Sequence, residues 1–491
     1  MLYRRSAQAL KTSFLNQETT ASQIAAYFIK RIQHLDGDVG AFLNVLADRV
    51  MTKAAELDLK RSRGEKVGKL AGIPIAIKDN LHIKGEITTC ASKFLANYQA
   101  PFSATVVDLI EKEDGLIIGK TNLDEFAMGS STEHSAFQLT RNPWNLSKTP
   151  GGSSGGSAAA TSARLAPISL GSDTGGSIRY PAALTGTVGF KPSYGRVSRF
   201  GLVEFGSSLD QIGPFANSVA DIALMMEVLG KPCSRDATSL PIDGKPYLDH
   251  LSTQIRGKKV GIPWHALDQL SESARNQFDT MVAKLKDLGA IMTEIKLNLM
   301  SASIPVYYIL ATAEASTNLA RFDGIRYGKR SEEAATLEEI YDFSRREGFG
   351  SEVKQRILLG TFVLSSGYQE AYYRKAQQVR TLMIREYQAA FATCDVIAMP
   401  VATAPAFDLG SIQNPVDMYL QDIYTVGANL AGLPAISLPT GLDEDQLPHS
   451  IQLIGPHFAE EKVLSFAYQL EQALQLSSFV PPLFDKELGD E

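Results

Sequence analysis

The sequence has few residues of the kinds that form disulfides or bind metals. Its three cysteines, Cys90, Cys233 and Cys394, lie far apart and include no CxxC motif. Widely spaced cysteines in odd number are typical of a protein in a reducing cytosol. The seven histidines include no HExxH motif and no pair spaced four residues apart. We therefore expect no metal site in this chain.

Basic clusters and long apolar runs are also missing. The net charge is −6, and the lysines and arginines are scattered, so the sequence lacks the positive footprint of a nucleic-acid binder. Any RNA in its function would be held by a partner. The stretch 396–407 is too short to span a membrane and contains Pro400 and Pro405.

The N-terminal segment has no secretory h-region. Residues 1–14 contain Arg4, Arg5 and Lys11 and no acidic residue, which weakly resembles an organellar presequence. We interpret the segment as a first helix. The expected location is therefore the cytoplasm of a bacterium, with an organelle as the alternative.

The composition and the hydrophobic pattern predict an α/β protein. Apolar residues make up 44% of the chain and charged residues 21%, which are ordinary globular values. Thr20 and Gln23 form a capping box before an amphipathic helix. Residues 71–80 and 115–122 are short apolar runs that end in polar residues, as strands of parallel sheets do. Ligands bind beyond the carboxyl ends of such strands, and Lys78 lies at one of them.

The C-terminal half continues the alternation of strands and helices. Residues 259–295 are predicted to form a βαβ unit, with further strands at 396–399 and 435–442 and a closing helix after them. Residues 310–390 are charged and helix-like. We therefore predict one domain over 1–491, with a central mixed sheet, helices on both faces and a helical insertion at about 310–390.

A glycine- and serine-rich stretch over 149–186 is either a flexible linker or a catalytic loop. Its first cluster, GGSSGGS, runs directly into an alanine-rich helix former, and a second cluster, GSDTGGS, follows. Two glycine-rich loops around one helix favour a structured loop. The P-loop and Rossmann motifs do not match. The GxSxG pattern at 151–155 lacks the preceding strand that a nucleophile elbow requires.

Serine and lysine together suggest acyl transfer. A lysine becomes a base when burial keeps it neutral, and Lys78 at a buried strand end fits that requirement. The glycines beside Ser177 would let backbone N–H groups converge on an oxyanion. The residues alone do not choose between Ser153 and Ser177 as the nucleophile. The alternative interpretation is a surface lysine and glycines that only form tight turns.

Three motifs, taken together, resemble those of the amidase signature family. They are GGSSGGSAAA (151–160), GSDTGGSIRYPAALTGTVGFKPSYGRVSR (171–199) and IPIAIKDN (73–80). The resemblance implies a signature core over 60–215. It also implies a Ser-Ser-Lys triad in which Ser177 is the nucleophile, Ser153 a bridging serine held in a cis peptide geometry, and Lys78 the base. By the same resemblance, backbone groups of Thr174, Gly175 and Gly176 form the oxyanion hole.

Segments such as DEFAMGSSTE (124–133) and GFGSEVKQRILLGTF (348–362) are similar to the glutamine-hydrolysing subunits of tRNA-dependent amidotransferases. In such enzymes ammonia passes to a B subunit, which uses ATP and Mg²⁺ to amidate Glu-tRNA(Gln) or Asp-tRNA(Asn). A C subunit ties the two together. This chain would then need no cofactor of its own. The substrate-binding residues implied are Arg356 for the glutamine α-carboxylate, Asp422 for the α-amine, and Tyr308 and Ser130 beside them.

Two features of the sequence depart from the pattern of those subunits. They are His134, where asparagine is typical, and Gln138-Leu139, where glycine and proline-like residues are expected. Both affect the loop beside the expected pocket and not the triad. Two other functions remain as alternatives: a stand-alone amidase with another small substrate, and a non-catalytic scaffold in which the glycine loops only pack.

Overall fold

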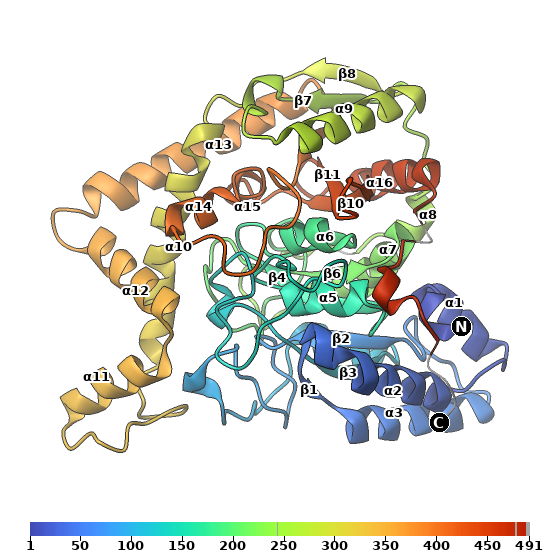
Figure 1. Ribbon diagram of the computed structural model, residues 1–491, viewed down its shortest axis with the longest axis horizontal. Coiled ribbons are helices and arrows are strands. Elements are labelled where there is room, and N and C mark those ends of the chain that lie inside the picture. Colours follow the sequence, from blue (N-terminus) through green and yellow to red (C-terminus); the bar gives the residue numbers. More distant parts are fainter. Residues whose placement is uncertain (243, 477–478, 488–491) are drawn as a thin grey trace.

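An eleven-stranded sheet runs through the computed structural model, which describes residues 1–242, 244–476 and 479–487 (Figure 1). The strand order is β1-β3-β2-β4-β6-β5-β10-β11-β9-β7-β8. The strands are β1 (Phe42–Val45), β2 (Pro74–Lys78), β3 (Leu116–Thr121), β4 (Ile168–Asp173), β5 (Val188–Lys191), β6 (Gln211–Ala216), β7 (Lys259–Ile262), β8 (Ile291–Glu294), β9 (Val396–Pro400), β10 (Ala435–Leu442) and β11 (Pro448–Ile454).

The sheet is mixed, as the sequence predicts. Strand β2 pairs in parallel with both β3 and β4. Strand β7 pairs in parallel with β8 and β9, and α9 lies between β7 and β8 in the chain, so the predicted βαβ unit is confirmed. The pairs in the middle of the sheet, from β4 to β9, are antiparallel.

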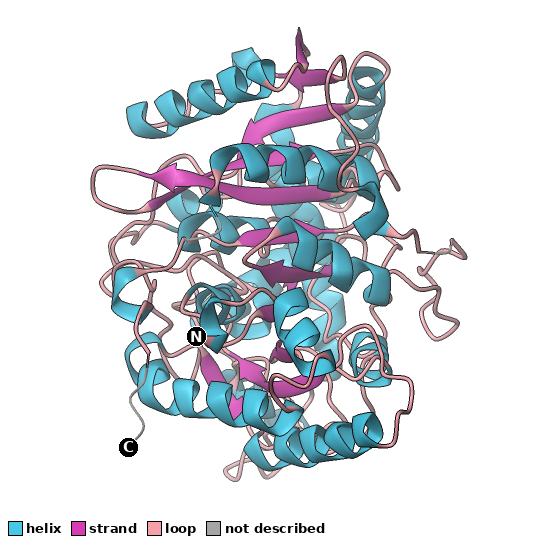
Figure 2. Cartoon of the chain, turned by 90° about the vertical axis from the view of Figure 1, so that its right-hand side faces the viewer, coloured by secondary structure: helices cyan, strands magenta, loops and turns pink. Residues whose placement is uncertain are grey.

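Helices cover both faces of the sheet (Figure 2). They are α1 (Ala7–Leu15), α2 (Ala21–Val39), α3 (Ala47–Ser62), α4 (Thr105–Lys112), α5 (Gly155–Ser162), α6 (Arg179–Thr185), α7 (Val219–Leu229), α8 (Tyr247–His250), α9 (Glu272–Asp287), α10 (Ser303–Asn318), α11 (Leu337–Gly348), α12 (Ser351–Leu364), α13 (Lys375–Phe391), α14 (Pro415–Leu420), α15 (Val426–Leu430) and α16 (Glu460–Leu474). The capping box of Thr20 and Gln23 begins α2, as predicted. Of these described helices, none is both long and apolar enough to cross a membrane.

Four helices between β8 and β9 form an arm at the side of the sheet, α10 to α13 (Figure 1). A hydrophobic cluster of its own holds this arm to the loops after β2 and β3. It includes Phe94, Phe126, Tyr308, Phe322 and Phe349. The predicted insertion at about 310–390 falls within the arm. Its exact limits, the single-domain description of 1–491 and the signature core at 60–215 stay predictions.

Close packing within the sheet gives a prediction about Gly213 in β6. A Cβ added there would overlap the carbonyl oxygen of Phe190 in the neighbouring strand β5. We expect Gly213→Ala to lower the free energy of unfolding by about 1–3 kcal/mol, because the strand backbone has to move. The midpoint of denaturant unfolding measures the effect.

The matched control for that variant is Gly37→Ala in the exposed end of α2. Nothing lies within 4 Å of a Cβ at Gly37. Alanine is a better helix former than glycine, so this variant should gain about 0.5–1 kcal/mol or stay neutral. Equal destabilisation of the two variants would contradict the packing argument.

Candidate active site

The glycine- and serine-rich stretch is a buried, ordered part of the fold. Residues 151–154 lead into α5, and the second cluster connects β4 to α6. All the residues from 150 to 182 are buried. The peptide bond between Gly152 and Ser153 is cis, in agreement with the geometry that the resemblance implies. The interpretation as a flexible linker is therefore wrong.

The topology of the sheet brings the two clusters to Lys78. Lys78 is the last residue of β2 and Asp173 the last of β4. Because these two strands are parallel neighbours, their carboxyl ends meet at one edge of the sheet. A backbone hydrogen bond of 3.2 Å from Ser154 N to Ser177 O joins the two serine loops there.

The amine of Lys78 lies at the centre of a group of serines. Its side chain is completely buried. Its Nζ is 2.8 Å from Ser153 Oγ, 2.8 Å from Ser154 Oγ and 3.0 Å from Ser172 Oγ. Burial lowers the pKa of Lys78 to about 7, and the carboxylate of Asp124 opposes part of that shift. The neutral amine is therefore well populated near neutral pH.

The hydrogen bonds of the neighbouring serines limit where a neutral Lys78 accepts a proton. Ser154 donates its hydroxyl proton to Ser172 O at 3.0 Å, so Ser154 Oγ accepts from Lys78. Ser172 Oγ already accepts from Asn80 Nδ2 at 3.0 Å. A neutral amine has two protons and one lone pair. Ser154 is therefore excluded as a proton donor to Lys78, and the lone pair accepts from Ser153 or Ser172.

Ser177 is the most exposed member of the expected triad, at 8%. Its Oγ has no hydrogen-bond partner among the residues that the structure describes. In the same described part of the chain, the backbone N–H groups of residues 174–177 also have no acceptor. A hydroxyl beside unpaired N–H groups is the arrangement that an acyl-transfer site requires.

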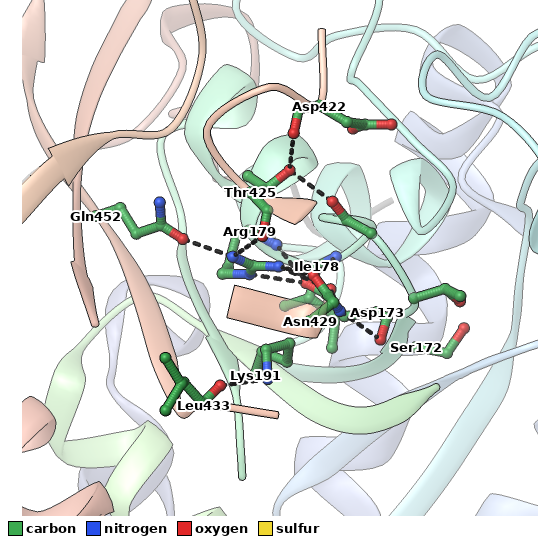
Figure 3. Close-up of polar contacts among 12 residues, drawn as sticks. Ser172, Asp173, Ile178, Arg179, Lys191, Asp422, Thr425, Asn429, Leu433 and Gln452 are labelled. Atoms are coloured by element: carbon green, nitrogen blue, oxygen red, sulfur yellow. Dashed lines mark hydrogen bonds and ion pairs between the residues drawn. The ribbon is translucent and has the colours of Figure 1, made fainter. Parts of the chain in front are cut away.

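A buried ion pair between Asp173 and Arg179 holds the two ends of the loop of residues 174–177 (Figure 3). The carboxylate of Asp173 is 3.0 Å from Arg179 Nη2 and also accepts from the backbone N–H of Ile178 at 3.1 Å. Burial raises the pKa of Asp173, but the Arg179 guanidinium has the larger opposite effect, and the pKa falls to about 2. Thr425 Oγ1 donates to Gly175 O at 2.6 Å, which ties α15 to the same loop.

The four expected substrate-binding residues lie together. Ser130 Oγ donates to Asp422 Oδ2 at 2.9 Å. The guanidinium carbon of Arg356 lies 5.2 Å from the centre of the Tyr308 ring. Burial raises the pKa of Asp422 to about 7, and Arg356 and Ser130 oppose the shift. A Cβ at Gly176 would lie 3.3 Å from Asp422 Oδ1, so this group adjoins the loop of Ser177.

Sequence reasoning missed four residues of the site. Ser154 and Ser172 hold the Lys78 amine, and both lie in the two glycine-rich motifs, which is the signal that could have found them. Asp124 accepts from Thr132 N at 2.9 Å and from His134 N at 3.1 Å. Glu352 accepts from Arg356 Nε at 2.7 Å. An (i, i+4) pair on the predicted helix was the available signal for Glu352.

The two departures in the loop of residues 133–140 are accommodated by backbone contacts. His134 contacts Asp124 through its main-chain N–H, a contact that any residue type except proline could make. Gln138 donates from Nε2 to Gly40 O and Phe42 O, both at 2.9 Å. The side chain of Leu139 is exposed. The Gln138 contacts hold the loop to the segment that leads into β1, whereas the His134 contact holds it to Asp124, beside the Lys78 site.

Comparisons with known proteins identify the family of this chain. A family model described as Amidase matches residues 23–464. The chain is 56% identical over 486 residues to the A subunit of the glutamyl-tRNA(Gln) amidotransferase of Protochlamydia amoebophila, with 99% of each chain covered. It is 50% identical over 487 residues to the same subunit of Chlamydia pneumoniae, again with 99% of each covered.

Solved structures show the same fold. The crystal structure of the A subunit of the glutamyl-tRNA(Gln) amidotransferase from Thermotoga maritima is 40% identical, has a TM-score of 0.80, and covers 96% of this chain and 95% of its own. A bacterial aryl acylamidase of the amidase signature family is 24% identical with a TM-score of 0.86 and 99% of each chain covered. That second likeness supports the fold alone.

Proposed function

Because this chain belongs to the amidase family and groups with the A subunits of glutamyl-tRNA(Gln) amidotransferase, we propose that its site hydrolyses glutamine through Ser177, Ser153 and Lys78. The chain is the amide-hydrolysing component of a multi-subunit amidotransferase. The observation that carries the mechanism is the position of the buried Lys78 amine, 2.8 Å from the Ser153 hydroxyl.

The reaction begins with attack of Ser177 Oγ on the side-chain amide carbon of glutamine. The Ser177 proton passes to Ser153, and the Ser153 proton passes to Lys78. Backbone N–H groups of residues 174–177, those of Thr174, Gly175 and Gly176 among them, bind the negative oxygen that forms. Lys78 returns the proton through Ser153 to the leaving nitrogen, the C–N bond breaks and ammonia leaves. Water then hydrolyses the acyl-enzyme, releasing glutamate and restoring Ser177.

Recognition of glutamine rests on two charged residues. The guanidinium of Arg356 would bind the α-carboxylate, and Asp422 would bind the α-ammonium together with Ser130. Tyr308 would form one wall beside Arg356. A bound ammonium would keep Asp422 ionised, although burial in the empty site raises the pKa of Asp422 to about 7.

The partners of this chain follow from the same proposal. A B subunit would hold the mischarged tRNA and activate its side chain with ATP and Mg²⁺, and a C subunit would tie the two together. The scattered basic residues and the net charge of −6 agree with tRNA being held elsewhere. The choice between Glu-tRNA(Gln) and Asp-tRNA(Asn) would belong to the B subunit. The cytoplasmic location stays a prediction.

Glutamate release tests this function directly. The chain is co-purified with its B and C subunits, supplied with glutamine, ATP and mischarged tRNA, and compared with its Ser177→Ala variant. We expect glutamate and amidated tRNA from the wild type and neither from the variant. Cleavage of other small amides with no action on glutamine would instead favour a stand-alone amidase. No hydrolysis of any amide, and no labelling of Ser177 by an acylating reagent, would favour a scaffold.

Replacing Arg356 by alanine should raise the KM for glutamine by about 30-fold or more, because a buried charged contact is lost. The kcat should change much less, since Arg356 does not contact the reacting amide. Arg346→Ala on α11 is the control, because Arg346 stacks on Phe343 at the surface. An unchanged KM in Arg356→Ala would contradict the assignment of the carboxylate site.

A further inference from the structure

The joint between α11 and α12, residues 349 and 350, contacts the segments that follow β2 and β3 as well as the rest of the helical arm. Phe349, in this joint, stacks on Phe94 with ring centres 5.0 Å apart and meets the edge of Phe126 at 5.5 Å. Glu125, which precedes Phe126, is buried at 2% exposure. The joint therefore rests on a part of the chain that adjoins the Lys78 site through Asp124.

Glu125 makes the polar contacts of this joint. Its Oε2 accepts a hydrogen bond of 2.8 Å from the backbone N–H of Gly350, the N-cap residue of α12. Its Oε1 accepts from Ser92 Oγ, which also contacts Gly348 O at 3.2 Å. Gly350 has no side chain that could cap the helix, and a carboxylate is favourable at a helix N-terminus. Glu125 thus supplies the cap of α12 from another part of the chain.

The first turns of α12 carry Arg356, which would bind the substrate carboxylate, and Glu352, which contacts Arg356. Glu352 lies in the first turn, and its Oε1 accepts from Arg356 Nε at 2.7 Å and from Tyr419 Oη at 3.3 Å. Arg356 follows one turn later and is 3% exposed. A shift of the α12 N-terminus would therefore move Glu352 and Arg356 together, away from Tyr308 and Tyr419.

From these contacts we propose that Glu125 is a positioning residue for glutamine recognition, which sets Arg356 by anchoring the N-terminus of α12. The inference rests on the proposed function. Burial raises the pKa of Glu125 to about 7, while hydrogen bonds from Ser92 and Gly350 oppose the shift. Burying a carboxyl group at position 125 is therefore less favourable in free energy than burying an apolar side chain there would be.

The test compares two amides that differ only at the group Arg356 would bind. One is glutamine, and the other is 4-aminobutanamide, which is glutamine without its α-carboxyl group. In the chain co-purified with its partner subunits, Glu125→Ala should raise the KM for glutamine about tenfold or more, because a small misplacement of a binding group is costly. The kcat for glutamine and the kcat/KM for 4-aminobutanamide should stay within about threefold.

Three further variants separate positioning from a general loss of structure. Glu125→Gln keeps an acceptor for Gly350 N–H and should restore most of the affinity for glutamine. Gly350→Ala would press a methyl group against Glu125 Oε2 at an ordinary backbone φ of −71°, so it should raise the KM even if Glu125→Ala folds poorly. Glu339→Gln alters the capping box of α11, in the same arm, and should leave both substrates unaffected.

The outcomes distinguish this inference from the function on which it rests. An unchanged KM for glutamine in both Glu125→Ala and Gly350→Ala would overturn the inference and leave glutamine hydrolysis standing. Equal losses on glutamine and 4-aminobutanamide would also overturn it, since the residue would then support the whole site. A wild type that cleaves 4-aminobutanamide and not glutamine would overturn the proposed function, and the inference with it.

Discussion

Replacing Ser177 by alanine should reduce glutamine hydrolysis by about 10⁴-fold or more while the protein stays folded. The expected loss is large because the variant has no atom that could form the acyl-enzyme. The fold should tolerate the change because Ser177 Oγ has no hydrogen-bond partner within the described residues, so its removal leaves no polar group unpaired. Glutamate release measures the activity, and thermal unfolding measures the stability.

Ser154→Ala is the matched control for that variant, because Ser154 lies in the same serine group and has a different task. Its hydroxyl donates to Ser172 O and accepts from Lys78. Its removal should lower the stability more than Ser177→Ala does, by about 1–3 kcal/mol, and the rate less. Retained turnover in Ser177→Ala would contradict its role as nucleophile, and an equal loss in both variants would leave the nucleophile unassigned.

The strands that carry Lys78 and Thr121 could be predicted because both signals are local. Each is a short apolar run, buried along its whole length, that ends in polar residues. Their parallel pairing follows from the same pattern. The strand order could not be predicted, because β10 pairs with β5, where Ala435 lies opposite Lys191, and these two strands are far apart in the sequence. Local periodicity holds no information about such pairing.

The candidate site likewise has features that the sequence predicts and features that only the fold shows. Lys78 at a strand end and two glycine-rich serine loops are visible in the sequence, and they suggest a lysine base. Neither its partners nor the choice between Ser153 and Ser177 followed from the residues, and the choice came from the family resemblance. Ser153, Ser154 and Ser172 all lie within 3.0 Å of the amine, and only the folded loops show which hydroxyl protons are already in use. The roles of all these residues stay predictions.

Arg356 shows why charged residues on helices are hard to assign from sequence. In the sequence it resembles any solvated helix arginine, whereas in the fold it is buried beside Glu352, Tyr308 and Tyr419. The burial depends on α10 and α14, which come from other parts of the chain and supply the two tyrosines. Composition and spacing therefore could not separate a buried arginine from a surface one. The binding role came from the resemblance and stays a prediction.

Replacing Lys78 by methionine should lower the rate of glutamine hydrolysis by about 10³-fold or more, because the general base and its proton are lost. The wild type should show the base in its pH profile. Burial lowers the pKa of Lys78 to about 7. The charged form, which cannot accept a proton, dominates below that pH. The kcat at saturating glutamine, where the bound ammonium keeps Asp422 ionised, should therefore rise as the pH increases through about 7. In Lys78→Met the residual rate should lack this rise.

Lys191→Met provides a control with the same substitution at an equally buried lysine. Burial lowers the pKa of Lys191 to about 7 as well, but its amine donates to the carbonyl oxygens of Pro192 and Leu433 and contacts no serine hydroxyl in the described chain. Both variants should lose stability, because each leaves buried acceptors unpaired. Only Lys78→Met should lose turnover and the pH dependence. Lys191→Met could also lose both turnover and the pH dependence. A lowered lysine pKa would then indicate burial in this fold and would not identify the general base. The proton path through Ser153 would have to be rejected.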